Sequence, residues 1–228
     1  VNACIPLLLC PLVLLFTDPE VSETRSPTYA SHIKQSVRYV SRHRLVASLV
    51  LYTSIMGAAV WALYNFYQPL LDALGFTVGS IGLLFTLFQL VGAAGAYLSD
   101  SVYEAVGETS VYLVPLCLAA SVLFLGFVSS PWVVGLVVVN FFISGFYLPV
   151  INDLLNQNLP SGQRATIISL SAVLSSLLNA AVDPILGRVA DIFSLRATFG
   201  AAGLGILVGM SLVLLFLRDE RRRTAWAP

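Results

Sequence analysis

Six apolar segments, each about as long as a membrane-spanning helix, dominate this sequence. They cover residues 45–70, 78–98, 110–129, 131–151, 165–187 and 197–217. At a rise of about 1.5 Å per residue, each can cross the hydrocarbon core of a bilayer as an α-helix. Hydrophobic residues make up 57% of the 228 positions and charged residues 11%, whereas soluble domains carry roughly 25% charged residues. The sequence therefore predicts an all-α, polytopic membrane helical bundle and excludes a cytosolic enzyme.

Two further stretches precede this six-helix unit, and a third follows it. Residues 1–16 form a shorter apolar run without the basic start or cleavage site of a signal peptide, so we expect a truncated transmembrane helix there. Residues 17–44 form a polar linker, whose second half places apolar residues at helical spacing among basic ones. This pattern is typical of an amphipathic helix on an anionic membrane surface, and equally of a solvated linker helix. The six spans fill residues 45–217, and residues 218–228 form a polar tail.

Basic residues are distributed unevenly about the spans. If the linker lies in the cytoplasm, ten of the twelve basic residues fall on the inner side, and only Arg188 and Arg196 fall on the outer side. Cytoplasmic loops of membrane proteins carry such an excess. We therefore expect the linker and the C-terminal tail to be cytoplasmic, in a multi-pass protein of the plasma (inner) membrane.

Four of the six spans carry polar side chains on one helical face. Polar groups are costly in lipid and tend to face a cavity or a neighbouring helix. The third and sixth spans have wholly apolar cores and are expected at the periphery, facing lipid; in the sixth, Gly205 and Gly209 form a GxxxG face that predicts helix packing. The other four then describe a half-bundle around an aqueous path. The substrate-binding residues predicted on their polar faces are Trp61, Tyr64, Asn65, Gln68, Gln89, Asn140, Tyr147, Asn179 and Asp183.

Several of these residues fit a second role. Amide side chains also join helices within a bilayer, so Gln89 and Asn140 fit packing as well as substrate contact. The aromatic run around Trp61 fits an interfacial belt or the wall of a site for an apolar or aromatic solute. Asp183 is the one carboxylate embedded in a span. It fits proton or cation coupling, or a hydrated carboxylate near the outer surface that pairs with Arg188.

Two stretches of the sequence resemble the major facilitator superfamily of transporters. One is YNFYQPLLDALGFTVGSIGLLFTLFQLVGAAGAYLSD, which resembles the family's seventh and eighth helices, with a Gln-Pro, a short "LG" turn and an "IG" opening of the next helix. The other is NQNLPSGQRATIISL, which resembles the loop before the eleventh helix. The resemblance implies the C-terminal half of a twelve-helix transporter, with residues 1–16 as the end of helix six and residues 17–44 as the central cytoplasmic loop. Such halves are three-plus-three inverted repeats, and the substrate site lies between the two halves.

The resemblance also implies gating roles for Asp100 and Arg164. The family's signature between helices eight and nine is Gly-x-x-x-Asp followed by basic residues. Asp100 matches its acidic position, but Ala96 replaces the glycine and no basic residue follows. Arg164 lies in the Arg-Ala-Thr of the loop before the eleventh helix.

Secondary active transport of a small solute by alternating access is the function that these features favour, with efflux of an apolar or neutral compound as the expected direction. The alternative is a half-size membrane protein that acts as a homodimeric transporter or as a non-transporting membrane subunit. An enzyme is disfavoured, because both histidines, His32 and His43, lie in the linker and no catalytic set can be assembled. The expected partners are the lipid bilayer, the solute, a missing N-terminal half-bundle and a coupling proton. No cofactor, metal or nucleic acid is expected.

Overall fold

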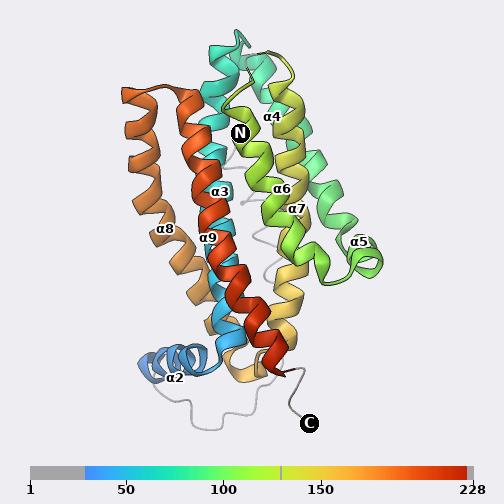
Figure 1. Cartoon of the computed structure of the whole chain (residues 1–228), viewed down its shortest axis with the longest axis vertical. Helices are drawn as coiled ribbons and strands as arrows, with labels where there is room; N and C mark the ends of the chain where they lie inside the picture. Colours follow the sequence, from blue (N-terminus) through green and yellow to red (C-terminus); the bar gives the residue numbers. More distant parts are fainter. Residues whose placement is uncertain (1–28, 129, 225–228) are drawn as a thin grey trace, which may run out of the picture.

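The computed structural model describes residues 29–128 and 130–224, in which every secondary-structure element is a helix. Consecutive long helices alternate in direction, and α2 lies at the same end of the bundle as the end of α9 (Figure 1). The predicted all-α, polytopic membrane bundle is confirmed, whereas the predicted helix at 1–16 lies outside the described residues. The elements are α2 (Tyr29–Arg42), α3 (Arg44–Ala73), α4 (Val78–Tyr97), α5 (Ser99–Val106), α6 (Thr109–Leu125), α7 (Val133–Gln157), the 3₁₀ turn η1 (Ser161–Gln163), α8 (Arg164–Ile192) and α9 (Leu195–Thr224).

Five helices, α3, α4, α7, α8 and α9, are long and apolar enough to cross a membrane. The third predicted span corresponds to α6, whose 17 residues are at the lower limit for a membrane helix. The sequence predicted a plain connection before α6, but residues Ser99–Val106 form α5, and the two helices are bent by 114° from each other. Gly107, at a φ of +65°, ends α5 in a backbone conformation that other residues rarely adopt. The bundle therefore has five spans, or six when the bent pair α5 and α6 is included.

The later helices extend beyond the apolar segments that predicted them. Helix α7 continues to Gln157, α8 to Ile192 and α9 to Thr224, so stretches expected as loops or tail are helical. These extensions contain no glycine or proline, the residues that usually interrupt a helix. Hydropathy thus located the apolar part of each helix, whereas the ends depend on helix-stopping residues such as Pro160 after α7.

Most of the helix contacts among the described residues correspond to one another when α3, α4 and α6 are exchanged with α7, α8 and α9, although α8 also packs on α9 and α4 makes no comparable contact with α6. Helix α3 packs against α8, α4 packs against α7, and α6 packs against α9. Two further contacts, α3 with α9 and α6 with α7, correspond to each other under the same exchange. The bundle therefore consists of two interlocked three-helix units, which meet through α3 with α8, α4 with α7, and α6 with α9.

Helices α6 and α9 have one packed face and one exposed apolar face. Their packed faces bury residues such as Leu118, Leu125 and Phe199, which are completely covered. Their opposite faces expose large apolar side chains, including Phe124 on α6 and Phe216 on α9. In a chain of this hydropathy, an exposed apolar face suits lipid contact.

Helices α4 and α7 approach so closely that glycine is needed at their crossing. A Cβ atom added to Gly145 of α7 would lie 2.6 Å from the carbonyl carbon and 2.9 Å from the Cα of Gly92 on α4. A Cβ atom added to Gly95 would collide with the backbone carbonyl of Phe142. Small residues allow helix backbones to meet in this way within membranes.

Helix α2 lies across the end of the bundle where α3 begins, and it contacts α3 and α8 (Figure 1). Ser36 is buried, and the Tyr39 hydroxyl group donates a hydrogen bond of 3.5 Å to the backbone oxygen of Asn158 at the end of α7. The Tyr39 ring also stacks on His43, with ring centroids 3.9 Å apart. The amphipathic segment of the linker is thus a helix docked onto the bundle.

Candidate functional site

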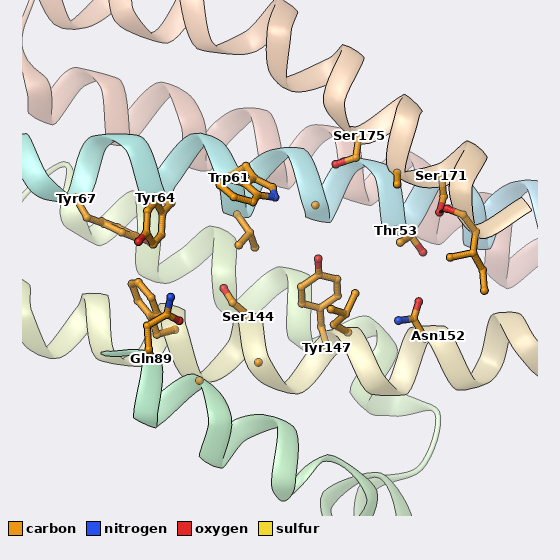
Figure 2. Close-up of a pocket in the computed structure, with 18 residues that line it drawn as sticks. Thr53, Trp61, Tyr64, Tyr67, Gln89, Ser144, Tyr147, Asn152, Ser171 and Ser175 are labelled. Carbon is orange, nitrogen blue, oxygen red and sulfur yellow. Dashed lines mark hydrogen bonds between the residues drawn. The ribbon is translucent and has the colours of Figure 1, made fainter. Parts of the chain in front are cut away.

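A cavity of about 590 Å³ lies among α3, α4, α7 and α8 (Figure 2). Neither α6 nor α9 contributes a residue to its wall. These are the two helices that correspond to the wholly apolar spans, so the division into four polar-faced helices and two peripheral ones matches the cavity lining. Its wall is formed by Thr53, Gly57, Val60, Trp61, Tyr64, Tyr67, Gln89, Gly92, Phe141, Ser144, Gly145, Tyr147, Leu148, Asn152, Ile168, Ser171, Ala172 and Ser175.

Helical spacing explains how α3 supplies one wall. Thr53, Gly57, Trp61 and Tyr64 follow one another at intervals of four, four and three residues and therefore share one face of the helix. Ser171 and Ser175 are one turn apart on α8 and face this wall in the same way (Figure 2). A single straight face on each helix is sufficient to build the cavity.

Aromatic rings enclose one end of the cavity. The ring of Tyr64 meets Phe85 edge to face at a centroid distance of 5.3 Å, and Phe141 packs against Phe88 at 5.2 Å. Trp61 remains 62% exposed, and its ring lies 6.1 Å from that of Tyr64. These contacts hold the rings in place. The exposed faces that remain can stack on an apolar or aromatic solute.

Hydroxyl and amide groups line the remainder of the cavity. The Tyr147 hydroxyl group points from α7 toward α3 (Figure 2), and a Cβ atom at Gly57 would lie 3.9 Å from it. The same Cβ atom would lie 2.6 Å from the hydroxyl oxygen of Ser175, so α3 and α8 are also close here. Gln89, Ser144 and other polar residues of the wall add hydrogen-bond donors and acceptors.

The cavity wall carries no formal charge. None of its eighteen described residues is an acid, a base or a histidine. Across residues 29–128 and 130–224, no group of three His, Cys, Asp or Glu side chains could hold a metal ion. The wall can therefore bind a solute through aromatic contact and neutral hydrogen bonds, but it offers no paired nucleophile and base for bond cleavage.

Four of the nine predicted substrate-binding residues line the cavity, and five do not. The four are Trp61, Tyr64, Gln89 and Tyr147. The five that lie elsewhere are Asn65, Gln68, Asn140, Asn179 and Asp183.

Asn140 lies on the packed side of α7. Its side chain is 1% exposed, and its Oδ1 atom accepts a hydrogen bond from the hydroxyl group of Ser121 on α6. This is the packing alternative that the sequence left open. A residue held between α6 and α7 does not reach the cavity between α3, α4, α7 and α8.

Asp183 and Asn65 form a polar link between α8 and α3. The Nδ2 group of Asn65 donates a hydrogen bond of 3.0 Å to Oδ2 of Asp183. No ion pair joins Asp183 to Arg188, although both side chains are described. The second carboxylate oxygen of Asp183 and the Oδ1 atom of Asn179, one turn earlier on α8, are buried without a hydrogen-bond partner.

The two predicted gating residues lie outside the cavity, toward the end of the bundle that carries α2. Asp100 is exposed in the first turn of α5. Arg164 begins α8, and its guanidinium group donates a hydrogen bond of 3.0 Å to the backbone oxygen of Asn156, at the end of α7. Arg164 therefore links the ends of two cavity-lining helices.

The sequence analysis did not select Thr53, Asn152, Ser171 or Ser175, which all line the cavity. Thr53 lies one turn before Gly57, so continuing the predicted face of α3 would have found it. On α8, Ser171, Ser175, Asn179 and Asp183 follow one another at intervals of four residues, so continuing the predicted stripe toward the start of the helix would have found the serine pair. The cavity ends before Asn179, and this limit depends on where α8 crosses α3.

The family model described as Major Facilitator Superfamily matches residues 1–182 and 49–227 of this chain. The two overlapping matches together cover almost its whole length. No curated protein matches it. The family match, the approximately symmetrical bundle of membrane-spanning helices and the cavity among four of them agree with one another. The chain therefore belongs to the Major Facilitator Superfamily of membrane transporters.

Proposed function

We propose that this chain supplies one half of a secondary active transporter that moves a small, neutral solute with aromatic or apolar surface by alternating access. The observation that carries the proposal is the uncharged cavity, which is shared by four helices of one half-bundle. In alternating access, such a half-bundle rocks against a second one, and the solute site between them opens to one side of the membrane at a time.

The exposure of α4 and α8 supports a second half-bundle. In the most apolar stretch of each helix, only 17% of the residues of α4 and 11% of those of α8 are buried, against 50% for α3. Both helices line the cavity, so the least covered helices are also those beside the solute site. A second six-helix unit packed on α4 and α8 would close the cavity and complete its wall.

The composition of the wall supports the solute class. A charged solute would lose its hydration in the cavity without an opposite charge from this half to replace it. A neutral solute instead exchanges its hydrogen bonds with water for bonds to groups such as Gln89 and Tyr147. Aromatic surface on the solute would stack on Trp61 and Tyr64.

Transport into proteoliposomes by the purified full-length protein tests the solute class. The probes are radiolabelled 2-naphthamide, 2-naphthoate and 2-naphthylmethylamine, which share an aromatic body and differ in charge. We expect uptake of the neutral amide to exceed that of the anion and the cation. Preferential uptake of either charged probe would contradict the proposal.

Two glutamines form a matched pair of variants for this assay. Gln89→Ala removes a polar group from the cavity wall, whereas Gln68→Ala changes an exposed residue outside it. Loss of one solute hydrogen bond should raise the KM for 2-naphthamide about threefold to tenfold in Gln89→Ala. The KM of Gln68→Ala should equal that of the unmodified protein. Equal effects of the two substitutions would show that the cavity does not hold the solute.

Proton coupling through Asp183 is the second part of the proposal. It is supported by the position of this carboxylate within α8, by its hydrogen bond to Asn65 on α3, and by its buried, unpaired oxygen. Protonation removes the negative charge and supplies a donor, so it changes the link between two cavity-lining helices. In Asp183→Asn, which cannot titrate, uptake should lose its response to a pH gradient, whereas Asp191→Asn, at the exposed end of α8, should keep it. A full response in Asp183→Asn would exclude Asp183 as the coupling group.

A further inference from the structure

A second hollow lies on the opposite side of α3 from the solute cavity, where α3, α8 and α9 meet. Its volume is about 300 Å³, and its wall is almost entirely apolar. Small side chains create the space, because Ala58, Ala62, Ala201 and Gly205 leave room where larger residues would fill it. On α3, Gly57 lines the solute cavity and its neighbour Ala58 lines the second hollow, so α3 separates the two spaces.

This hollow continues into a shallower groove along α8. The groove has a volume of about 350 Å³ and shares Ile185 and Val189 with the wall of the hollow. It runs toward the end of α8 that is joined to α9, away from α2 (Figure 1). Ile192 and Phe193 flank it and are strongly exposed.

Arg188 is the only charged residue in the wall of the groove. It is exposed, and it makes no ion pair within the part of the chain whose side chains are described. The two adjoining spaces therefore combine an apolar slot with a nearby cation. The cation lies one turn before the end of a membrane-spanning helix, from where a long side chain can reach the lipid head groups.

We propose that this groove binds a phospholipid, with one acyl chain in the slot between α3, α8 and α9 and the phosphate on Arg188. If a methylene group occupies roughly the volume of a water molecule, about 30 Å³, the slot holds on the order of ten carbons of an acyl chain. The guanidinium group suits a phosphate, to which it can donate two parallel hydrogen bonds. An anionic lipid is preferred, because the groove carries a cation and no acid.

The lipid would contact the same helix that lines the solute site. Residues of one face of α8 line both spaces: Ser171 and Ser175 border the solute cavity, and Leu178 and later residues border the slot. The bound lipid would therefore pack against the continuation of the cavity-lining face of α8.

Native mass spectrometry of the full-length protein tests the proposal. The protein is released from nanodiscs made of equal parts dioleoyl-phosphatidylglycerol and dioleoyl-phosphatidylcholine, and the lipids that remain attached are counted. We expect adducts enriched in phosphatidylglycerol. Arg188→Gln should lower this enrichment about tenfold, the effect of losing a charge-assisted hydrogen bond. Arg196→Gln, which removes an exposed cation at the same end of the bundle from outside both spaces, should leave the enrichment unchanged.

A second variant tests the slot independently of the head group. A Cβ atom at Gly205 meets nothing within 4 Å, so the side chain of Gly205→Leu can enter the slot and should reduce adducts of both lipids. Gly135→Leu, at an equally open position on α7 outside the slot, is the control. Equal enrichment in Arg188→Gln and Arg196→Gln would overturn the head-group assignment even if Gly205→Leu did not fold. Two copies of the chain without lipid adducts would also overturn the proposal, because a second copy would then cover the groove.

Discussion

Replacing Gly145 by alanine should force α4 and α7 apart. In the structure, a Cβ atom at this position would lie 2.6 Å from the carbonyl carbon of Gly92 and 2.9 Å from its Cα. Carbon atoms in favourable contact are about 3.5 Å apart, so these separations must grow by about 0.9 Å and about 0.6 Å. The obstacle is backbone, which has no rotamer to change, so the whole helix must move.

The cost of this movement can be bounded. Overpacking in a close-packed interior typically costs about 1–3 kcal/mol. Alanine favours a helix over glycine by about 1 kcal/mol, which offsets part of the loss. Because the obstacle is helix backbone, we expect the gross cost at the top of this range, about 3 kcal/mol, and hence a net loss of about 2 kcal/mol. For a chain of this size, that loss lowers the unfolding midpoint by roughly 4–8 °C.

The thermal unfolding midpoint of the purified protein in detergent provides the measurement, and Gly135→Ala provides the control. Gly135 lies on the same helix, but a Cβ atom there meets nothing within 4 Å. The control should therefore be as stable as the unmodified protein or slightly more stable. Gly92 and Gly145 both line the cavity, so Gly145→Ala should also weaken solute binding.

A midpoint for Gly145→Ala equal to that of Gly135→Ala would refute this reasoning. It would mean that α4 and α7 can separate at no cost, and that the close crossing is not part of the stable bundle. The same result for Gly95→Ala, whose Cβ atom would meet the Phe142 carbonyl group, would extend this conclusion to the whole α4–α7 contact.

Two further substitutions separate packing from function. Asn140→Ala removes the acceptor of the Ser121 hydroxyl group between α6 and α7. It should lower the free energy of unfolding by about 0.6 kcal/mol, or at most about 2 kcal/mol, without changing the KM for the solute. A raised KM with an unchanged melting curve would show that Asn140 contacts the solute and does not serve helix packing. Thr77→Ala removes the oxygen that caps α4 by accepting a 3.3 Å hydrogen bond from the backbone N–H of Ser80. It should cost about 1 kcal/mol in thermal unfolding, whereas Thr77→Ser should recover most of this loss, and a fully stable alanine variant would argue against the cap.

The sequence predicted the fold class and the role of each helix because both depend on the average character of long segments. A span needs about 20 apolar residues, and a helix with a wholly apolar core has no polar group to direct toward a cavity. These averages identified α6 and α9 as the two helices outside the cavity lining. They could not predict α5, whose eight residues are too short and too mixed to stand out from a loop.

Individual contacts depend on how each helix is rotated and where it crosses its neighbours. The GxxxG pair Gly205 and Gly209 predicted close packing, yet Gly205 borders the slot, and a Cβ atom at Gly209 would make only ordinary contact with Ile55. The closest crossing is formed instead by Gly92 and Gly145. Because glycine marks places where a backbone can approach, but not the partner that does so, sequence spacing alone does not identify the contact.

The candidate site shows the same division. The chain by itself determined that polar faces exist on α3, α4, α7 and α8, since periodicity is a property of a single helix. The tertiary structure decided that Gln89 faces the cavity while Asn140 faces Ser121. It also decided that Asn65 meets Asp183, a pair 118 residues apart in the chain. Each of these outcomes depends on the rotation of one helix against another, and that rotation is fixed by the summed packing of all their neighbours rather than by any local run of residues.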